Sequence, residues 1–202
     1  MTRHNLVGDV AHLPDHAFGA KSVIFWGTLA FMIAEGMGFV LAGGGYLYLM
    51  GQATAWPPEG TRPPDLLWGT LFTLVLLVSW IPNHRTDKAA RAYDVRQTRV
   101  GVIVVAAFAI VALVIRGFEL ASLNTRWDQH AYGSIVWALM FLHTVHLVTD
   151  LADTTVLGAF MFARDVDGER FSDVEDNCGY WDFVVITWLP IYALVYWAPR
   201  LL

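Results

Sequence analysis

Five apolar runs in this chain are each long enough to cross a lipid bilayer as a helix, and they limit the possible folds more than any other feature. About 20 apolar residues suffice, because a helix rises about 1.5 Å per residue across about 30 Å of hydrocarbon. The predicted helices cover about 22–50, 64–82, 100–123, 131–162 and 180–199. The composition agrees, since 15% of the 202 residues are charged, against about 25% in soluble domains.

The continuous character of these runs separates helices from β-barrel strands, which alternate apolar and polar residues. The sequence therefore predicts an all-α, polytopic membrane bundle of five transmembrane helices. Residues 1–21 are expected to form a cytoplasmic N-terminal arm, and residues 22–202 a single transmembrane domain. The first run starts only after Lys21, so we expect it to be retained as an anchor and not cleaved.

The distribution of Lys and Arg predicts the orientation of the helices. In a five-helix arrangement, one side holds nine of these residues: Arg3, Lys21, Arg85, Lys88, Arg91, Arg96, Arg99, Arg164 and Arg170. The opposite side holds only Arg62, Arg126 and Arg200, with Arg116 near a helix end. The N-terminus is therefore predicted to be cytoplasmic and the C-terminus to lie outside. The acidic segment 165–176 is expected to be a solvated cytoplasmic loop.

Polar residues inside the predicted helices are the candidate functional residues, because a charge at the bilayer centre costs about 2.5–3.5 kcal/mol. Glu35 lies about 20 Å along the first helix. The fourth helix carries a stripe of polar residues at helical spacing: His143, His146, Asp150 and Asp153. His143 is expected at the depth of Glu35, which motivates a hydrogen bond between Glu35 and a histidine. Structural glue and a functional role stay equally open for Glu35.

Other sequence features predict a local ion pair and argue against nucleic-acid, metal and haem binding. Arg116 and Glu119, three residues apart near a helix end, are expected to form a local ion pair at the membrane interface. No basic patch is dense enough to indicate a nucleic-acid partner. The lone Cys178 excludes cysteine-rich metal sites, and only one helix offers histidines for haem or di-iron ligation. We therefore expect no catalytic site, cofactor or metal on this chain.

Several motifs occur in an order that resembles subunit III of haem–copper oxidases (cytochrome c oxidase), in its short five-helix bacterial form. The first helix carries Phe31-Met32-Ile33-Ala34-Glu35-Gly36, similar to the family's aromatic-rich helix with one glutamate. The family's Trp-Pro-Pro-x-Gly loop is matched by Trp56, Pro57, Pro58 and Gly60. The later elements are Phe118-Glu119, the His-x-x-His pair His143 and His146, and Tyr180-Trp181-Asp182-Phe183-Val184 with Trp188. In the last motif the family usually has histidine at the position of Asp182 and aspartate at that of Val185. Asp150 stands in place of a family glycine.

The resemblance implies an accessory subunit without haem or copper, which are expected in partner subunits. It would pack beside oxidase subunits I and II in a bacterial cytoplasmic membrane. It would bind phospholipid in a cleft between its helices, supporting proton uptake and the stability of subunit I. The buried carboxyl of that cleft would be Glu35, with His143 and His146 nearby and Glu119 as a further candidate.

Three other hypotheses stay open, one of them a b-type cytochrome that would use His143 or His146 as a haem ligand. The substituted closing motif is compatible with the related accessory subunit of nitric oxide reductases. Alternatively, Glu35 and the histidine stripe could serve as the proton relay of a small proton-coupled transporter, although the chain lacks the internal repeat that transporters often show.

Overall fold

The computed structural model describes residues 23–163 and 168–201, and within them the chain is all helix and turn. Five helices are long and apolar enough to span a membrane. They are α1 (Val23–Gln52), α2 (Leu66–Arg91), α3 (Val95–Ala121), α4 (Ala131–Ala163) and α5 (Gly168–Tyr192). A π-helical segment, η1 (Ala193–Trp197), and the short α6 (Ala198–Leu201) continue α5 without a break. The predicted class, a five-helix membrane bundle, is confirmed. The predicted N-terminal arm lies outside the described residues.

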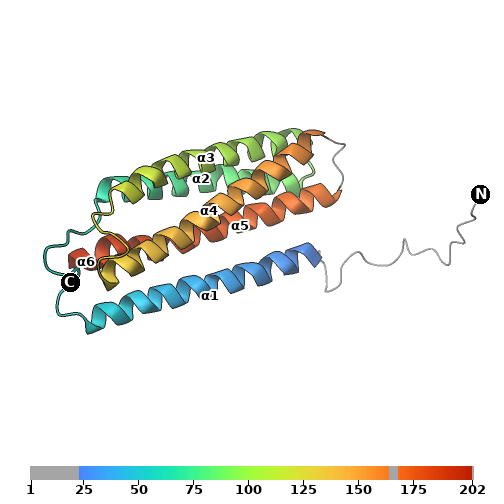
Figure 1. Ribbon diagram of the computed structural model, residues 1–202. Coiled ribbons are helices and arrows are strands. Elements are labelled where there is room, and N and C mark those ends of the chain that lie inside the picture. The colour runs from blue at the N-terminus through green and yellow to red at the C-terminus, as the bar shows by residue number, and fades with distance from the viewer. Residues whose placement is uncertain (1–22, 164–167, 202) are drawn as a thin grey trace, which may run out of the picture.

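Helices α2 to α5 form a compact group, and α1 lies along one edge of it (Figure 1). The closest pairs are α2 with α3 and α2 with α5, whereas α1 packs mainly against α4 and α5. Of the described α1 side chains only Phe39 and Tyr46 are buried. Its remaining surface is apolar, as expected of a helix whose outer face contacts lipid or another membrane protein.

Two helices extend further than the apolar runs predicted. Helix α2 continues to Arg91 instead of ending near residue 82, and α5 begins at Gly168 instead of near residue 180. The predicted loop over 165–176 is therefore wrong from Gly168 onward, and residues 164–167 are not described. Both extensions are polar, so an apolar-run criterion misses them. Arg91 forms ion pairs with Asp87 on its own helix at 2.9 Å and with Glu175 on α5 at 3.5 Å, so it joins the two extensions.

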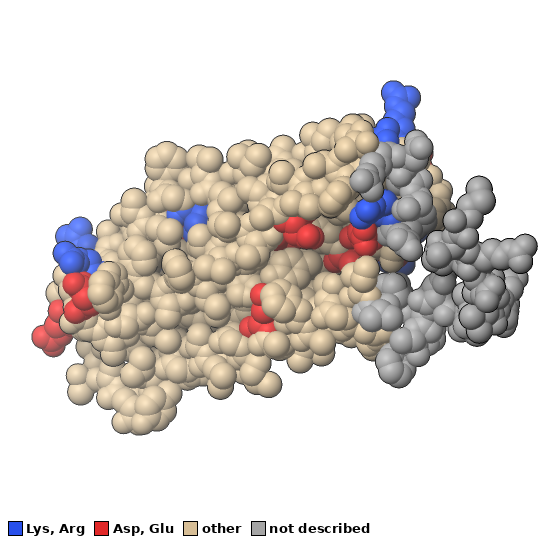
Figure 2. Space-filling model, turned by 45° about the vertical axis from the view of Figure 1, so that its right-hand side comes forward, with Lys and Arg blue, Asp and Glu red and all other residues tan. Residues whose placement is uncertain are grey.

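A second, small core explains why these polar extensions are ordered. Its buried members come from the ends of four helices: Ala90, Val102, Leu157, Met161, Phe171, Val174 and Cys178. Burying such side chains contributes favourable free energy of about 25 cal/mol per Å² of apolar surface. Figure 2 shows charged side chains gathered towards both ends of one face, with a few charged groups of both signs on the mostly uncharged surface between them.

The loop between α1 and α2 is held against the bundle by the predicted Trp-Pro-Pro motif. The Trp56 indole donates a hydrogen bond to the Tyr46 hydroxyl at 2.8 Å. Its ring meets those of Tyr46 and Tyr132 edge-on, with centroids 5.2 Å and 5.0 Å apart. The bond between Trp56 and Pro57 is cis. This motif therefore closes one end of the bundle over the α1–α4 contact.

Candidate functional site

One group of polar residues forms a buried cluster between α2, α3, α4 and η1, which we call the ionic cluster: Arg116, Glu119, His143 and Tyr196. The Arg116 and Glu119 side chains are 1% and 0% exposed, and their charged atoms lie 2.7 Å apart. The predicted ion pair is confirmed, but it lies inside the bundle and not at an exposed interface. The Tyr196 hydroxyl donates a 2.5 Å hydrogen bond to the other oxygen of Glu119.

Aromatic rings enclose the Arg116 guanidinium. Its central carbon lies 3.8 Å from the centroid of Phe72 and 4.3 Å from that of Trp188. Such cation–π contacts are strongest where water is excluded. They compensate part of the cost of burying a charge in the membrane interior. The ionic cluster is thus electrically balanced and sealed.

His143 completes the ionic cluster in one defined protonation state. Its Nδ1 lies 3.0 Å from an Arg116 nitrogen, and its Nε2 lies 3.0 Å from the carbonyl oxygen of Val184. Arginine can only donate and a carbonyl can only accept. His143 is therefore neutral with its proton on Nε2. Both ring nitrogens are occupied, which leaves neither available for a metal or haem.

A second group lies between α1, α4 and α5, and we call it the acidic cluster: Glu35, His146, Asp150, Asp153 and Tyr180. Tyr180 donates a 2.8 Å hydrogen bond to one Glu35 oxygen. His146 Nε2 lies 3.1 Å from the other oxygen, within ion-pair distance but poorly aligned for a hydrogen bond. The predicted partnership of Glu35 with a histidine therefore involves His146, while His143 belongs to the ionic cluster.

The Glu35–His146 contact requires a proton. His146 Nδ1 lies 2.5 Å from the Leu142 carbonyl oxygen, so Nδ1 carries a hydrogen. Without a second proton, lone pairs of Nε2 and the Glu35 oxygen would face each other at 3.1 Å. A proton on either of these two atoms removes the repulsion between the lone pairs.

Asp150 and Asp153 continue the polar stripe of α4, as their spacing predicted. Asp150 is 0% exposed, and neither of its carboxyl oxygens makes a hydrogen bond of normal geometry, although the Thr154 hydroxyl lies close enough to interact with it. The neighbouring Thr154 hydroxyl, which could donate to it, is paired with Asn177 at 3.2 Å. Asn177 in turn donates to Asp153 at 3.0 Å.

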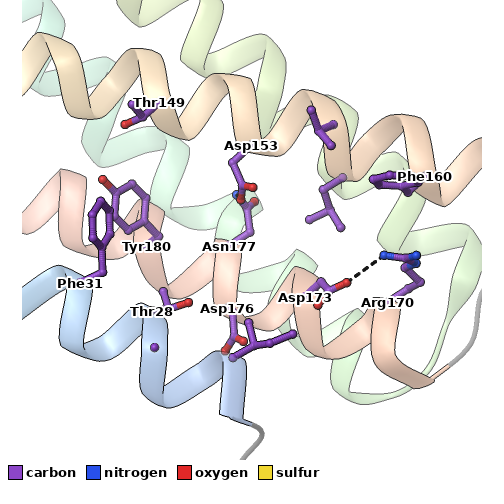
Figure 3. Close-up of a pocket in the computed structure, with 14 residues that line it drawn as sticks. Thr28, Phe31, Thr149, Asp153, Phe160, Arg170, Asp173, Asp176, Asn177 and Tyr180 are labelled. Atoms are coloured by element: carbon purple, nitrogen blue, oxygen red, sulfur yellow. Dashed lines mark hydrogen bonds and ion pairs between the residues drawn. The ribbon is translucent and has the colours of Figure 1, made fainter.

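A cavity of about 540 Å³ opens beside the acidic cluster, between the start of α1, the end of α4 and the start of α5. Figure 3 shows Phe31 and Tyr180 facing each other on one side, and Asp153 and Asn177 meeting between α4 and α5. Arg170 and Asp173 form an ion pair at 3.3 Å at its other end. The cavity thus joins apolar walls to a charged rim.

Asp182, which stands where the resembling family has histidine, pairs with α2. Asn83 donates to the Asp182 carboxylate at 2.8 Å and to the Cys178 carbonyl oxygen at 2.9 Å. Val185 is 1% exposed and packs in the large hydrophobic core to which all five long helices contribute. The polar substitution at position 182 therefore has a local hydrogen-bond partner, and the apolar one at position 185 fits its surroundings.

Tyr180, Tyr196 and Asn177 are the site residues that the sequence analysis missed. Tyr180 lay within a recognised motif, but its partner on α1 is distant in sequence. Tyr196 lies in the π-helical segment, whose register a regular helical period does not give. Among the described residues, no group of three or more His, Cys, Asp or Glu side chains is arranged to hold a metal ion.

Comparison with known proteins gives one consistent result. The sequence pattern of the family described as cytochrome c oxidase subunit III matches residues 3–199. The chain is 28% identical to cytochrome c oxidase subunit 3 of Thermostichus vulcanus, over 92% of each protein. It is 25% identical to cytochrome c oxidase subunit 3 of a Synechocystis strain, covering 88% of this chain and 77% of that protein. It is also 25% identical to the probable cytochrome c oxidase subunit 3 of Nocardia farcinica, covering 90% and 91%. The family match extends over nearly the whole sequence, so this five-helix membrane protein belongs to the cytochrome c oxidase subunit III family.

Proposed function

We propose that this chain is the non-catalytic accessory subunit III of a haem–copper terminal oxidase in aerobic respiration. The observation that carries the proposal is the family match over residues 3–199. In this assembly the chain packs beside subunits I and II, which hold the haem and copper. Its place is the bacterial cytoplasmic membrane, with the N-terminus inside and the C-terminus outside.

The described surface supports a role within an assembly. Large apolar side chains are exposed along α1, including Phe31, Ile33, Met37, Val40 and Leu41. The same is true of α3, including Ile103, Ile110, Val111 and Val114. Such faces suit lipid or helices of partner subunits, because close packing drives association in membranes.

Purification of the tagged chain with its lipids from the native host tests the assignment. We expect a haem-containing subunit I to co-purify and the preparation to consume oxygen. Consumption of nitric oxide without oxygen uptake would instead assign the chain to a nitric oxide reductase. Recovery of the chain alone at every detergent level, with proton-coupled uptake in vesicles, would replace the proposal with the transporter reading.

Support of subunit I is tested in the same complex. We expect an oxidase assembled without this chain to take up protons more slowly and to lose activity during sustained turnover, with its initial oxygen consumption less affected. Equal inactivation rates with and without the chain would remove this part of the proposal.

We further propose that the cavity between α1, α4 and α5 binds phospholipid. Its apolar walls include Ile24, Phe31, Val156 and Phe160, and Arg170 offers a cation to a phosphate group at the rim. Gly27 lines this cavity, and a Cβ added there has nothing within 4 Å. Replacing Gly27 with Leu should therefore fill the cavity without a clash inside the chain.

The matched control is Gly44→Leu, because Gly44 lies on the same helix with equally open surroundings but outside the cavity. Native mass spectrometry of the purified complex should show fewer bound phospholipids for Gly27→Leu than for Gly44→Leu. Equal lipid counts in the two variants would contradict a lipid site in this cavity.

The orientation can be tested by labelling with a membrane-impermeant thiol reagent. The native Cys178 is 3% exposed and should react slowly. We expect a cysteine at exposed Tyr93, between α2 and α3, to be labelled from the cytoplasmic side, and one at Glu59, between α1 and α2, from outside. The reverse pattern would invert the proposed orientation.

A further inference from the structure

Asp150 differs from the other buried ionisable groups considered above, because it has no countercharge and no hydrogen bond of normal geometry. Its side chain is fully buried, and the Thr154 hydroxyl, one turn along α4, is the donor that interacts with it. Among the described residues, no Lys, Arg or His side chain lies within ion-pair distance of it. An isolated carboxylate in such surroundings is so unfavourable that the group takes up a proton instead.

The groups that face Asp150 reinforce this conclusion. On α4 they are Asp153, which interacts with it electrostatically, and His146, one helical turn away. On α5 they are Tyr180 and Cys178, and on α1 the nearest is Glu35, which shares Tyr180 as a neighbour. Asp153 is a carboxyl, and its negative charge favours a neutral Asp150. The one base, His146, is already engaged with Glu35.

Asp150 does not line the cavity, but two of the groups that interact with it, Asp153 and Tyr180, do. Asp153 and Asn177 both line the cavity (Figure 3). Asn177 also contacts the Thr154 hydroxyl, at 3.1 Å from its Nδ2, and Thr154 lies next to Asp150 on the helix. Hydroxyl and amide groups of this kind can exchange partners with water. A proton carried by water in the cavity therefore has a short polar route inward.

We propose that Asp150 binds an exchangeable proton inside the bundle, supplied from the cavity between α1, α4 and α5, and that it is a protonatable neighbour of the Glu35–His146 pair. In the exchange step, hydronium in the cavity gives its proton to the Asp150 carboxylate, which leaves water and a neutral carboxylic acid. The proposed site does not depend on which oxidase the chain accompanies.

Infrared difference spectroscopy of the complete purified complex tests the presence of this proton. The wild type should show the C=O stretch of a protonated carboxyl at neutral pH, which Asp150→Asn removes. The matched control is Asp128→Asn, because Asp128 is an exposed carboxylate paired with Arg126 and should not contribute to that band. A band that remains unchanged in Asp150→Asn would overturn the proposal.

A second variant tests the assignment of the band if the Asp150→Asn chain does not assemble into the oxidase complex. Thr154→Val keeps the carboxyl but removes the neighbouring hydroxyl, so it should shift the band without abolishing it. An unshifted band would place the protonated carboxyl elsewhere and overturn the assignment to Asp150.

The route of exchange is tested by transfer into D₂O, which should lower the frequency of the Asp150 band in the wild type. Filling the cavity with Gly27→Leu should slow this change at least several-fold relative to Gly44→Leu. A band that never shifts in D₂O, or equal rates in the two glycine variants, would overturn supply from the cavity.

Discussion

The ionic cluster and the acidic cluster differ in how they compensate ionisable side chains that are buried in the bundle. Both place ionisable side chains inside a membrane bundle, where an unpaired charge is costly. In the ionic cluster the Arg116 cation matches the Glu119 anion, and aromatic rings exclude water. In the acidic cluster three carboxyl groups meet one histidine, and a cavity lies beside them. The first arrangement pairs its buried charges, whereas in the second Asp150 has no countercharge.

The two clusters should also differ in how substitutions and pH affect the stability of the protein. A balanced and sealed cluster should respond strongly to loss of either partner and weakly to pH. An acid-rich cluster beside a cavity should lose little stability on conservative substitution, but the number of protons bound to it should change with pH. The predictions below test this difference.

The largest expected effect is in the ionic cluster. Arg116→Leu leaves Glu119 and His143 buried without their partner, and breaking a buried ion pair from one side costs about 3–5 kcal/mol. Denaturation of the purified protein in mild detergent should show this loss of stability. The control is Arg91→Leu, because Arg91 is 54% exposed and surface pairs contribute about 0–1 kcal/mol. Equal losses in the two variants would remove the distinction between sealed and exposed pairs.

The second prediction concerns the close packing that positions Tyr196 in the ionic cluster. A Cβ on Gly69 would lie 2.4 Å from the Tyr196 ring, so Gly69→Ala must displace the ring that donates to Glu119. Overpacking of this kind costs about 1–3 kcal/mol. Gly44→Ala is the control, since its added methyl meets nothing. Thermal unfolding that is the same for both variants would show that Tyr196 moves aside without loss.

A smaller effect is expected in the acidic cluster. Glu35→Gln keeps an oxygen that accepts from Tyr180 but removes the carboxylate that lies 3.1 Å from His146 Nε2. A net loss of about 0–1 kcal/mol is expected, because an ion pair that is still reached by solvent contributes little. Glu59→Gln, in the exposed loop between α1 and α2, provides the control for charge alone. A loss as large as that of Arg116→Leu would mean that Glu35 is structural in the same sense as Arg116.

Sequence reasoning predicted the five helices and the stripe on α4 because hydrophobic runs and helical spacing are local properties. It also predicted that Arg116 would pair with Glu119, three residues along one helix. It did not assign His143 and His146 to different clusters, because their separation depends on how α1, α3 and α5 rotate against α4. Sequence reasoning did not predict that the polar ends of α2 and α5 are helical, for a related reason. They are ordered by a small tertiary core and not by an apolar run of their own.

The smallest expected effect lies outside both buried clusters, at the start of α3. Asp94 accepts hydrogen bonds from the Gln97 backbone and side-chain nitrogens at 2.9 Å and 2.6 Å, and these hold its pKa below the ordinary value. A carboxyl with a lowered folded-state pKa stabilises the protein above the unfolded-state pKa, about 3.9. That contribution is lost as the pH falls through the folded-state value.

Asp94→Ala should therefore lower the thermal midpoint slightly at pH 7, and the difference from wild type should shrink as the medium becomes acidic. Asp94→Asn keeps a side-chain acceptor for the helix start, so its deficit should be smaller and nearly constant with pH. Thermal unfolding of the three proteins across this range measures both trends. If instead Asp94→Ala produced a loss as large as Gly69→Ala, exposed caps would matter to this bundle as much as buried packing, and the contrast between water-facing and sealed groups would fail.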